Sequence, residues 1–209
     1  SITLLDYRIK VEEKNYSFTS DWFSWTIPLW KKQLQQFVDQ PNLNFLEIGS
    51  WEGRSTCWML ENILTHPSAK ITCIDTFQGS FEHQSYDAER INSLEGRFDS
   101  NIEKSGSAEK VQKIVGSSHQ VLPGLPQDHY DLIYVDGSHL ACDVLMDAVF
   151  SWQLAKLDGI IVFDDYEFQF PENPGQNTKI GIDGFLNSFA SKLEIIHAGY
   201  QLIIKKIAV

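Results

Sequence analysis

The chain has 209 residues, of which 43% are hydrophobic, and a formal net charge of -11 at pH 7. This length supports one hydrophobic core and predicts a single domain. The acidic charge excludes nucleic acid as a partner, because binding to a phosphate backbone draws on lysine and arginine, and it favours a small molecule. No apolar run reaches the roughly 20 residues of a membrane helix, and the first residues are too charged for a secretion signal. We therefore expect no membrane contact and a cytoplasmic location.

The three cysteines, Cys57, Cys73 and Cys142, are odd in number, lie far apart and form no CxxC pair. This spacing fits neither a disulfide framework nor a zinc site. We expect all three to be buried thiols in a reducing compartment.

Short apolar runs of the strand type alternate with helical periodicity along the chain. Pro28 opens the first amphipathic stretch, which predicts a helix over residues 28–38. Strands are then expected at 44–48, 71–74, 111–115, 131–135 and 159–163, and helices at 55–64, 91–104, 142–154 and 180–189.

The helix expected after the fourth strand gathers apolar residues on one side, namely Cys142, Leu145, Met146, Val149, Phe150 and Leu154. The chain ends with two further strands, at 193–197 and 201–205, whose tight link predicts a hairpin. The predicted fold class is α/β. It is a Rossmann-like, seven-stranded, mostly parallel sheet with helices on both faces and a C-terminal antiparallel hairpin.

The first strand leads into a turn of the pattern ExGxxxGxS, where Gly49 and Gly53 let the backbone pass close to a ligand. The turn lacks the GxGxxG that accommodates a pyrophosphate, so it suits S-adenosylmethionine better than a dinucleotide. A glycine-containing turn without ligand is the alternative. Asp75 ends the second strand, where an acid can accept both hydroxyls of a ribose, and the pair of features favours a nucleoside ligand.

Four motifs follow one another at these strand ends: LEIGSWEGRST, CIDTF, YVDGSH and IIVFDDY. Together they resemble the class I S-adenosylmethionine-dependent methyltransferases, specifically the small O-methyltransferase-like group called methyltransferase family 24. The resemblance runs from residue 20 to the end of the chain. We expect one methyltransferase domain over 1–209, with an N-terminal lid or helical segment at 1–40 and a cofactor-binding core at 41–209.

The resemblance also implies which residues bind the cofactor, S-adenosylmethionine. The predicted set is Glu47, Gly49, Ser50, Gly53 and Ser55 at the first turn, Asp75, Thr76 and Phe77 at the ribose, Ser117 and Ser118 at the adenine, and Asp136.

Three acids, Asp136, Asp164 and Asp165, end neighbouring strands and are expected to converge as oxygen ligands for Mg²⁺ or another divalent metal. The resemblance supports this, since metal-dependent relatives place acids at these two strand ends. A metal would lower the pKa of a substrate hydroxyl. The alternative is hydrogen bonding without metal, with Asp165 capping the following loop.

His139 lies three residues after Asp136, where metal-dependent relatives carry a lysine that takes the substrate proton. Histidine suits that task near neutral pH, so His139 and Asp136 are the predicted catalytic residues. A structural or solvated histidine is the competing interpretation.

The acceptor is expected to be a hydroxylated small molecule, bound near Trp22–Trp25 and residues 78–86, although core packing explains each Trp equally well. A homo-oligomer is possible, and the sequence does not decide the oligomeric state. A nicotinamide oxidoreductase is disfavoured by the absent GxGxxG, and a nucleic-acid methyltransferase by Asp136-Gly-Ser-His in place of an Asn/Asp-Pro-Pro-aromatic motif. A metal-independent methyltransferase and a non-catalytic cofactor-binding partner domain remain as alternatives.

Overall fold

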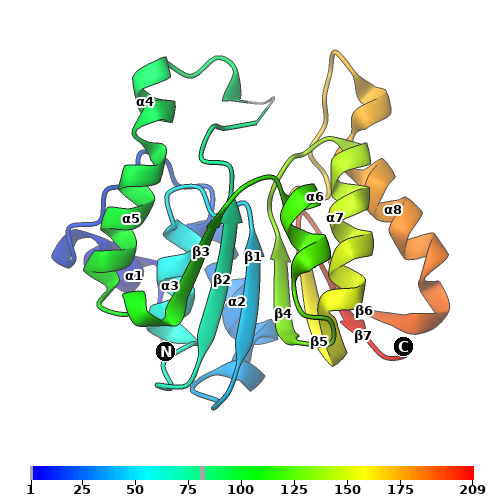
Figure 1. The fold of residues 1–209 in the computed structure, drawn as a ribbon, viewed down its shortest axis with the longest axis horizontal. Helices are drawn as coiled ribbons and strands as arrows, with labels where there is room; N and C mark the ends of the chain where they lie inside the picture. The colour runs from blue at the N-terminus through cyan, green and yellow to red at the C-terminus, as the bar shows by residue number, and fades with distance from the viewer. Residues whose placement is uncertain (1, 81–82) are drawn as a thin grey trace.

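The computed structural model describes residues 2–80 and 83–209. One sheet organises them, and its strands run in the order β3-β2-β1-β4-β5-β7-β6 (Figure 1). The strands are β1 (Asn44–Ile48), β2 (Lys70–Asp75), β3 (Val111–Val115), β4 (Tyr130–Val135), β5 (Ala155–Phe163), β6 (Leu193–Ala198) and β7 (Leu202–Lys206). β1 to β5 pair in parallel, whereas β7 is antiparallel to β5 and to β6. The predicted fold class is confirmed.

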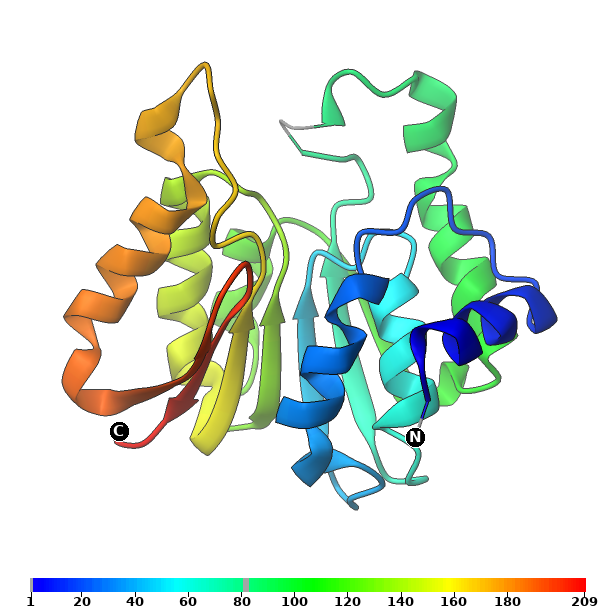
Figure 2. The same cartoon turned by 180° about the vertical axis from the view of Figure 1, so that it is seen from behind.

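Helices cover both faces of the sheet, as Figures 1 and 2 show. They are α1 (Leu4–Glu13), α2 (Ile27–Gln33), α3 (Arg54–Asn62), α4 (Ala88–Asn92), α5 (Leu94–Ser105), α6 (Ser118–Val121), α7 (Ala141–Leu154) and α8 (Thr178–Ser188). α2, α3 and α5 contribute Trp30, Trp58 and Phe98 to the core on one face, and α7 and α8 contribute Trp152 and Phe185 on the other. Burying these large side chains supplies most of the drive for the two layers to close.

Helix α1 was not predicted: Leu4, Tyr7 and Val11 recur at helical spacing and pack against the core, but the apolar Leu5 and Ile9 lie on the exposed side and obscure the pattern. A capping box starts it: the hydroxyl of Thr3 accepts from the Asp6 amide, and the Asp6 carboxylate accepts from the Thr3 amide. The helix expected over 28–38 ends early, since α2 stops at Gln33 and a 3₁₀ turn follows at Gln35–Phe37. The N-terminal segment lies across α3 and α5 (Figure 2).

The apolar side predicted for α7 is correct for Leu154, which is buried, and for Phe150, which packs against the same core, but it is wrong for the rest of the row. Leu145, Met146 and Val149 are 36–42% exposed, and the face against the sheet is formed instead by Val144, Ala148 and Trp152. The reason is that α7 is apolar on most of its circumference, so periodicity alone cannot select the buried row. No helix of the described residues is long and apolar enough to cross a membrane.

The prediction of buried thiols holds for Cys57 and Cys73, which lie in the core. It is wrong for Cys142, which is exposed in the first turn of α7. Cys142 belongs to the same side of α7 as the exposed apolar residues, so the two errors have one cause.

Candidate functional site

A pocket of about 1020 Å³ lies beyond the carboxyl ends of the parallel strands. This is where ligands bind in sheets of this topology. Nine of the predicted site residues line it: Gly49, Asp75, Thr76, Ser117, Ser118, Asp136, His139, Asp164 and Asp165. Ser50 and Ser55 instead border a neighbouring cavity of about 40 Å³.

The turn after β1 requires glycine at position 49. Gly49 has φ +87°, and a Cβ there would lie 2.0 Å from the carbonyl oxygen of Asp136. Any side chain would therefore force the ends of β1 and β4 apart. At Gly53, which has φ +82°, a Cβ would lie 3.1 Å from the Phe98 ring. The two glycines therefore let the turn pack closely, Gly49 against the end of β4 and Gly53 against α5.

Glu47 is fully buried beneath this turn and does not line the large pocket. Its carboxylate accepts hydrogen bonds from the hydroxyls of Ser55 and Thr56 in α3. Burial raises the pKa of Glu47, and the two hydroxyls partly oppose that rise. The hydrogen bond between Glu47 and Ser55 joins β1 to α3 beneath the turn, so both residues support the pocket from below.

Asp75 lies at the end of β2 with both oxygens engaged by the backbone. Its Oδ2 accepts from the Trp51 amide at 2.8 Å and its Oδ1 from the Phe77 amide at 2.8 Å. Burial raises the pKa of Asp75, against the lowering effect of these amides. Thr76 lines the pocket beside it, whereas the Phe77 ring packs on Phe98 at a centroid distance of 5.1 Å.

The end of β3 brings Ser118 and His119 against a buried acid that the sequence did not single out. Asp147 of α7 accepts from the Ser118 hydroxyl at 2.6 Å, and its Oδ1 lies 3.2 Å from His119 Nε2. The hydrogen bond to Asp147 raises the pKa of His119. Asp147 was missed because it lies mid-helix, where an acid usually faces solvent.

The acids at the ends of β4 and β5 converge. Asp136, His139 and Asp165 each offer one ligand atom, and these atoms lie within 4.8 Å of one another. His139 Nε2 is 2.7 Å from Asp165 Oδ2. The carboxyl group of Asp164 lies beside that of Asp136, and the two share a hydrogen bond when one of them carries a proton. Among the described residues, the tightest potential metal group thus contains His139 in place of the predicted Asp164, which lies directly beside it.

Crowding of these carboxylates changes their acidity. Burial, followed by the charges of Asp164 and Asp165, raises the pKa of Asp136 well above its usual value. Burial and the charge of Asp165 raise the pKa of Asp164 to about 6. Burial also acts on Asp165, but its bonds to His139 and Tyr200 leave the pKa lowered. Three carboxylates this close together, with Asp165 buried and the other two half-buried in the pocket lining, require protons or a cation to coexist.

Residues from outside the motifs hold these acids in place. Gln201, fully buried, donates from Nε2 to Asp164 Oδ1 at 3.1 Å and accepts from Trp30 Nε1 at 2.7 Å. The Tyr200 hydroxyl donates to Asp165 Oδ1 at 2.7 Å. Asp165 itself has φ +60°. Sequence reasoning missed these partners because they come from α2 and the β6–β7 turn, far away along the chain.

Four rings form an aromatic wall on the opposite side of the pocket: Trp22, Trp51, His83 and Tyr86. Trp51 stacks on His83 with ring centroids 4.4 Å apart, and Trp22 stacks on His83 at 5.8 Å. Trp22 and Trp25 both line the pocket, whereas Phe23 between them packs in the core on Trp30. Of the predicted acceptor segment 78–86, residues 81–82 lie outside the described residues.

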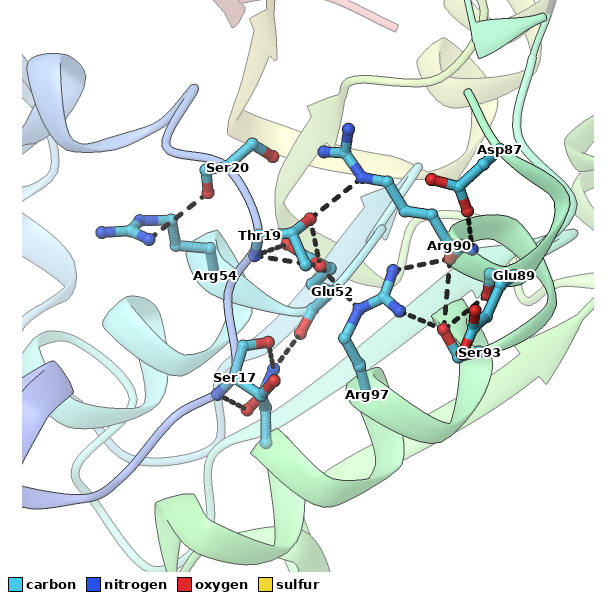
Figure 3. A network of polar contacts seen from close by, with 11 residues as sticks. Ser17, Thr19, Ser20, Glu52, Arg54, Asp87, Glu89, Arg90, Ser93 and Arg97 are labelled. Carbon is cyan, nitrogen blue, oxygen red and sulfur yellow. Dashed lines mark hydrogen bonds and ion pairs between the residues drawn. The ribbon is translucent and has the colours of Figure 1, made fainter. Parts of the chain in front are cut away.

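Buried Glu52 links the three segments that carry the aromatic wall (Figure 3). It accepts from the Thr19 amide and hydroxyl and from Arg97 Nε, at 2.9, 2.8 and 2.7 Å. Arg90 Nε in turn donates to the Thr19 hydroxyl at 3.2 Å, and its guanidinium lies 4.1 Å from the Tyr86 ring centroid. The network therefore fixes the N-terminal segment, the first turn and α4–α5 relative to one another.

Comparisons with known proteins agree with this architecture. A family model described as a methyltransferase domain, that of methyltransferase family 24, matches residues 46–166, more than half of the chain. No match was found among curated proteins.

Solved structures share the fold. The O-methyltransferase TomG from Streptomyces achromogenes, in complex with SAM, superposes with a TM-score of 0.62 at 15% identity, covering 99% of this chain and 89% of that one. An O-methyltransferase from Bacillus cereus in complex with SAH gives 0.62 at 16% identity, covering 98% and 90%. The methyltransferase MycE, in complex with Mg, SAH and mycinamycin VI, gives 0.64 at 14% identity, covering all of this chain and 55% of its own.

Proposed function

This chain belongs to the class I S-adenosylmethionine-dependent methyltransferases, in methyltransferase family 24, and from that premise we propose that it methylates a hydroxyl of a small molecule with the help of a divalent metal. The observation that carries the proposal is the contact between two parts of the pocket. The glycine turn at Gly49 and the acidic group at Asp136 touch through their backbones. A methyl donor bound at the turn would therefore lie beside the acids.

The cofactor site we propose uses the pocket wall from β1 to β3. Asp75 lines the pocket with a carboxylate that the Trp51 and Phe77 amides hold in place, and we assign it to the ribose hydroxyls. Ser117 and Ser118 line the pocket next to it, at the place we assign to the adenine. Glu47, Ser55 and Phe77 act beneath this wall by fixing its shape. Residues 1–40 are the proposed lid over the core formed by 41–209.

The donor set fits a hard divalent cation. Carboxylate oxygens suit Mg²⁺ and Mn²⁺. Asp136, Asp164 and Asp165 would hold the ion, whose charge would lower the pKa of a bound hydroxyl. The raised pKa values of Asp136 and Asp164 favour such a fit, because a cation would relieve the repulsion among the three carboxylates.

We propose His139 as the base. Asp165, hydrogen-bonded to Nε2, orients the ring, and Phe168 packs on it with ring centroids 4.5 Å apart. His139 would accept the proton of the acceptor hydroxyl as that oxygen bonds to the methyl carbon and the carbon–sulfur bond breaks. Bound S-adenosylmethionine would supply the activated methyl group, with S-adenosylhomocysteine as the leaving group. The protein contributes orientation and proton transfer.

The test is methyl transfer from labelled S-adenosylmethionine to a panel of hydroxylated acceptors, with and without chelator. We expect chelation to abolish transfer and Mg²⁺ or Mn²⁺ to restore it. Calorimetry with S-adenosylhomocysteine should show binding in both conditions. Full turnover in excess chelator would show that no metal is needed. Asp136 and Asp164 would then be assigned to direct hydrogen bonds with the substrate. Cofactor binding without turnover of any acceptor would favour the non-catalytic alternative.

A further inference from the structure

The pocket has a strongly one-sided charge. Seven aspartates line it, whereas none of the described residues lining it is a lysine or an arginine. The aspartates include Asp75, Asp136, Asp143, Asp164 and Asp165. A negative cleft with low-dielectric walls concentrates cations and repels anions.

From this lining we infer that the methyl acceptor is a neutral or positively charged ring compound, held against the aromatic wall, and that anionic acceptors are excluded. The inference rests on the proposed function, since it names the substrate class of the same site. Coenzyme A thioesters, phosphate esters and carboxylates would find no lysine or arginine to pair with among the described residues that line the pocket, so their binding is disfavoured.

Nearby cations offset only part of this charge. Arg54 Nε lies 3.0 Å from Asp21 Oδ1, and His119 pairs with Asp147. The sulfonium of the cofactor and a divalent ion would add positive charge at the acidic end. Burial, together with the charges of His139 and Arg90, lowers the pKa of His83 to about 4. His83 is therefore neutral at pH 7, and the aromatic wall gains no positive charge from it.

The aromatic wall suits a flat or cationic ligand. Trp22 in the wall and Trp25, which packs on Tyr200, are each 48% exposed, and both line the pocket. Large aromatic faces left open in a cavity are contact surfaces for rings and for cations, which the ring quadrupole attracts. Trp22 stacks on His83 at 20° and lies at 25° to Tyr86, whereas His83 and Tyr86 are tilted by 45°, so the three rings pack closely around Trp22.

Polar contacts hold the wall in position. Glu52 and Arg97 hold the strand-end turn against the N-terminal segment (Figure 3), and the Arg90 guanidinium lies over the Tyr86 ring. A preorganised surface of this kind binds with little ordering cost. Its geometry therefore selects ring shape, while the acids select charge.

The experiment measures binding of three probes to the protein saturated with S-adenosylhomocysteine and Mg²⁺, by quenching of tryptophan fluorescence and by calorimetry. Dopamine, hydroxytyrosol and dihydroxyphenylacetate share a catechol ring and differ in a side chain that ends in ammonium, hydroxyl or carboxylate. We expect the ammonium probe to bind at least about tenfold more tightly than the carboxylate, with the neutral probe between them. The difference should shrink as salt is added.

Equal or tighter binding of the carboxylate overturns the charge inference, and absence of binding by all three overturns the ring inference. Either result leaves the proposed function standing if S-adenosylhomocysteine still binds. Trp25→Lys places a positive charge in the pocket wall and should reduce the ammonium preference severalfold, whereas the matched neutral variant Trp25→Gln should keep it. Identical preferences in the two variants would show that pocket charge does not select the acceptor.

Discussion

The two sides of the pocket are built in different ways. On the acidic side, Asp136, Asp164 and Asp165 follow directly from the ends of β4 and β5, so the sheet itself positions them. On the aromatic side, Trp22 and Tyr86 come from segments outside the sheet, and the Glu52 network holds them there. A sheet order fixes the first side in any protein with this topology, whereas the second depends on contacts particular to this chain. We expect chemistry to reside in the first and acceptor choice in the second.

The largest expected effect breaks the aromatic side. Glu52→Gln leaves Arg97 without its buried partner, and removal of one member of such a pair should lower the free energy of unfolding by about 3 kcal/mol. Glu95→Gln is the matched control. It removes an exposed acid that pairs with Lys113 at 2.7 Å, so it should cost under about 1 kcal/mol. Urea unfolding followed by tryptophan fluorescence measures both. Equal effects of the two variants would mean that Glu52 does not hold the wall.

The next effect concerns the acidic side. His139→Gln should lower turnover by roughly 100-fold, about 2.7 kcal/mol in the transition state, with unchanged affinity for S-adenosylhomocysteine. Mn²⁺ affinity, followed by electron paramagnetic resonance, separates two roles. A base leaves metal affinity intact, whereas a ligand lowers it together with turnover. His129→Gln, at a histidine outside the pocket, serves as the control, and wild-type turnover in His139→Gln would end the assignment as base.

A smaller effect is expected where the cofactor is held. Asp75→Asn keeps the shape but loses the charge that accepts the ribose hydroxyls, which should weaken binding of S-adenosylhomocysteine by on the order of 1–3 kcal/mol. Asp99→Asn, at an exposed acid on α5, is the control and should bind normally. Calorimetry gives the two dissociation constants. An unchanged affinity in Asp75→Asn would show that the ribose binds elsewhere in the pocket and not at Asp75.

The features that could be predicted from the sequence divide in the same way, into those set by the sheet and those set by contacts between distant segments. β1, with its turn at Gly49, and the acids after β4 and β5 were predictable because short apolar runs and strand-end positions are local signals. The exposed row of α7 was mispredicted, since a helix apolar on most sides carries no periodic signal. Gln201, Glu52 and Asp147 were missed because their roles arise from partners distant in sequence. Long-range polar partners are invisible to spacing alone.

Two histidines allow the smallest and most specific test of the comparison. The hydrogen bond to Asp147 raises the pKa of His119, so this interaction stabilises the fold below the ordinary histidine pKa of 6.5 and the stabilisation is lost as pH rises through the raised pKa. His83 has a pKa lowered to about 4 by burial, so protonation favours the unfolded chain as pH falls below 6.5.

His119→Asn should therefore destabilise more at about pH 5.5 than at about pH 8.5, and His83→Asn should show the opposite slope. Both histidines are partly exposed, so solvent screening keeps each difference to about 0.5 kcal/mol. Thermal unfolding across this pH range, with His66→Asn as a control outside the pocket, measures the slopes. Slopes of the same sign would contradict these assignments, because Asp147 stabilises a protonated His119 whereas burial in the aromatic wall stabilises a neutral His83.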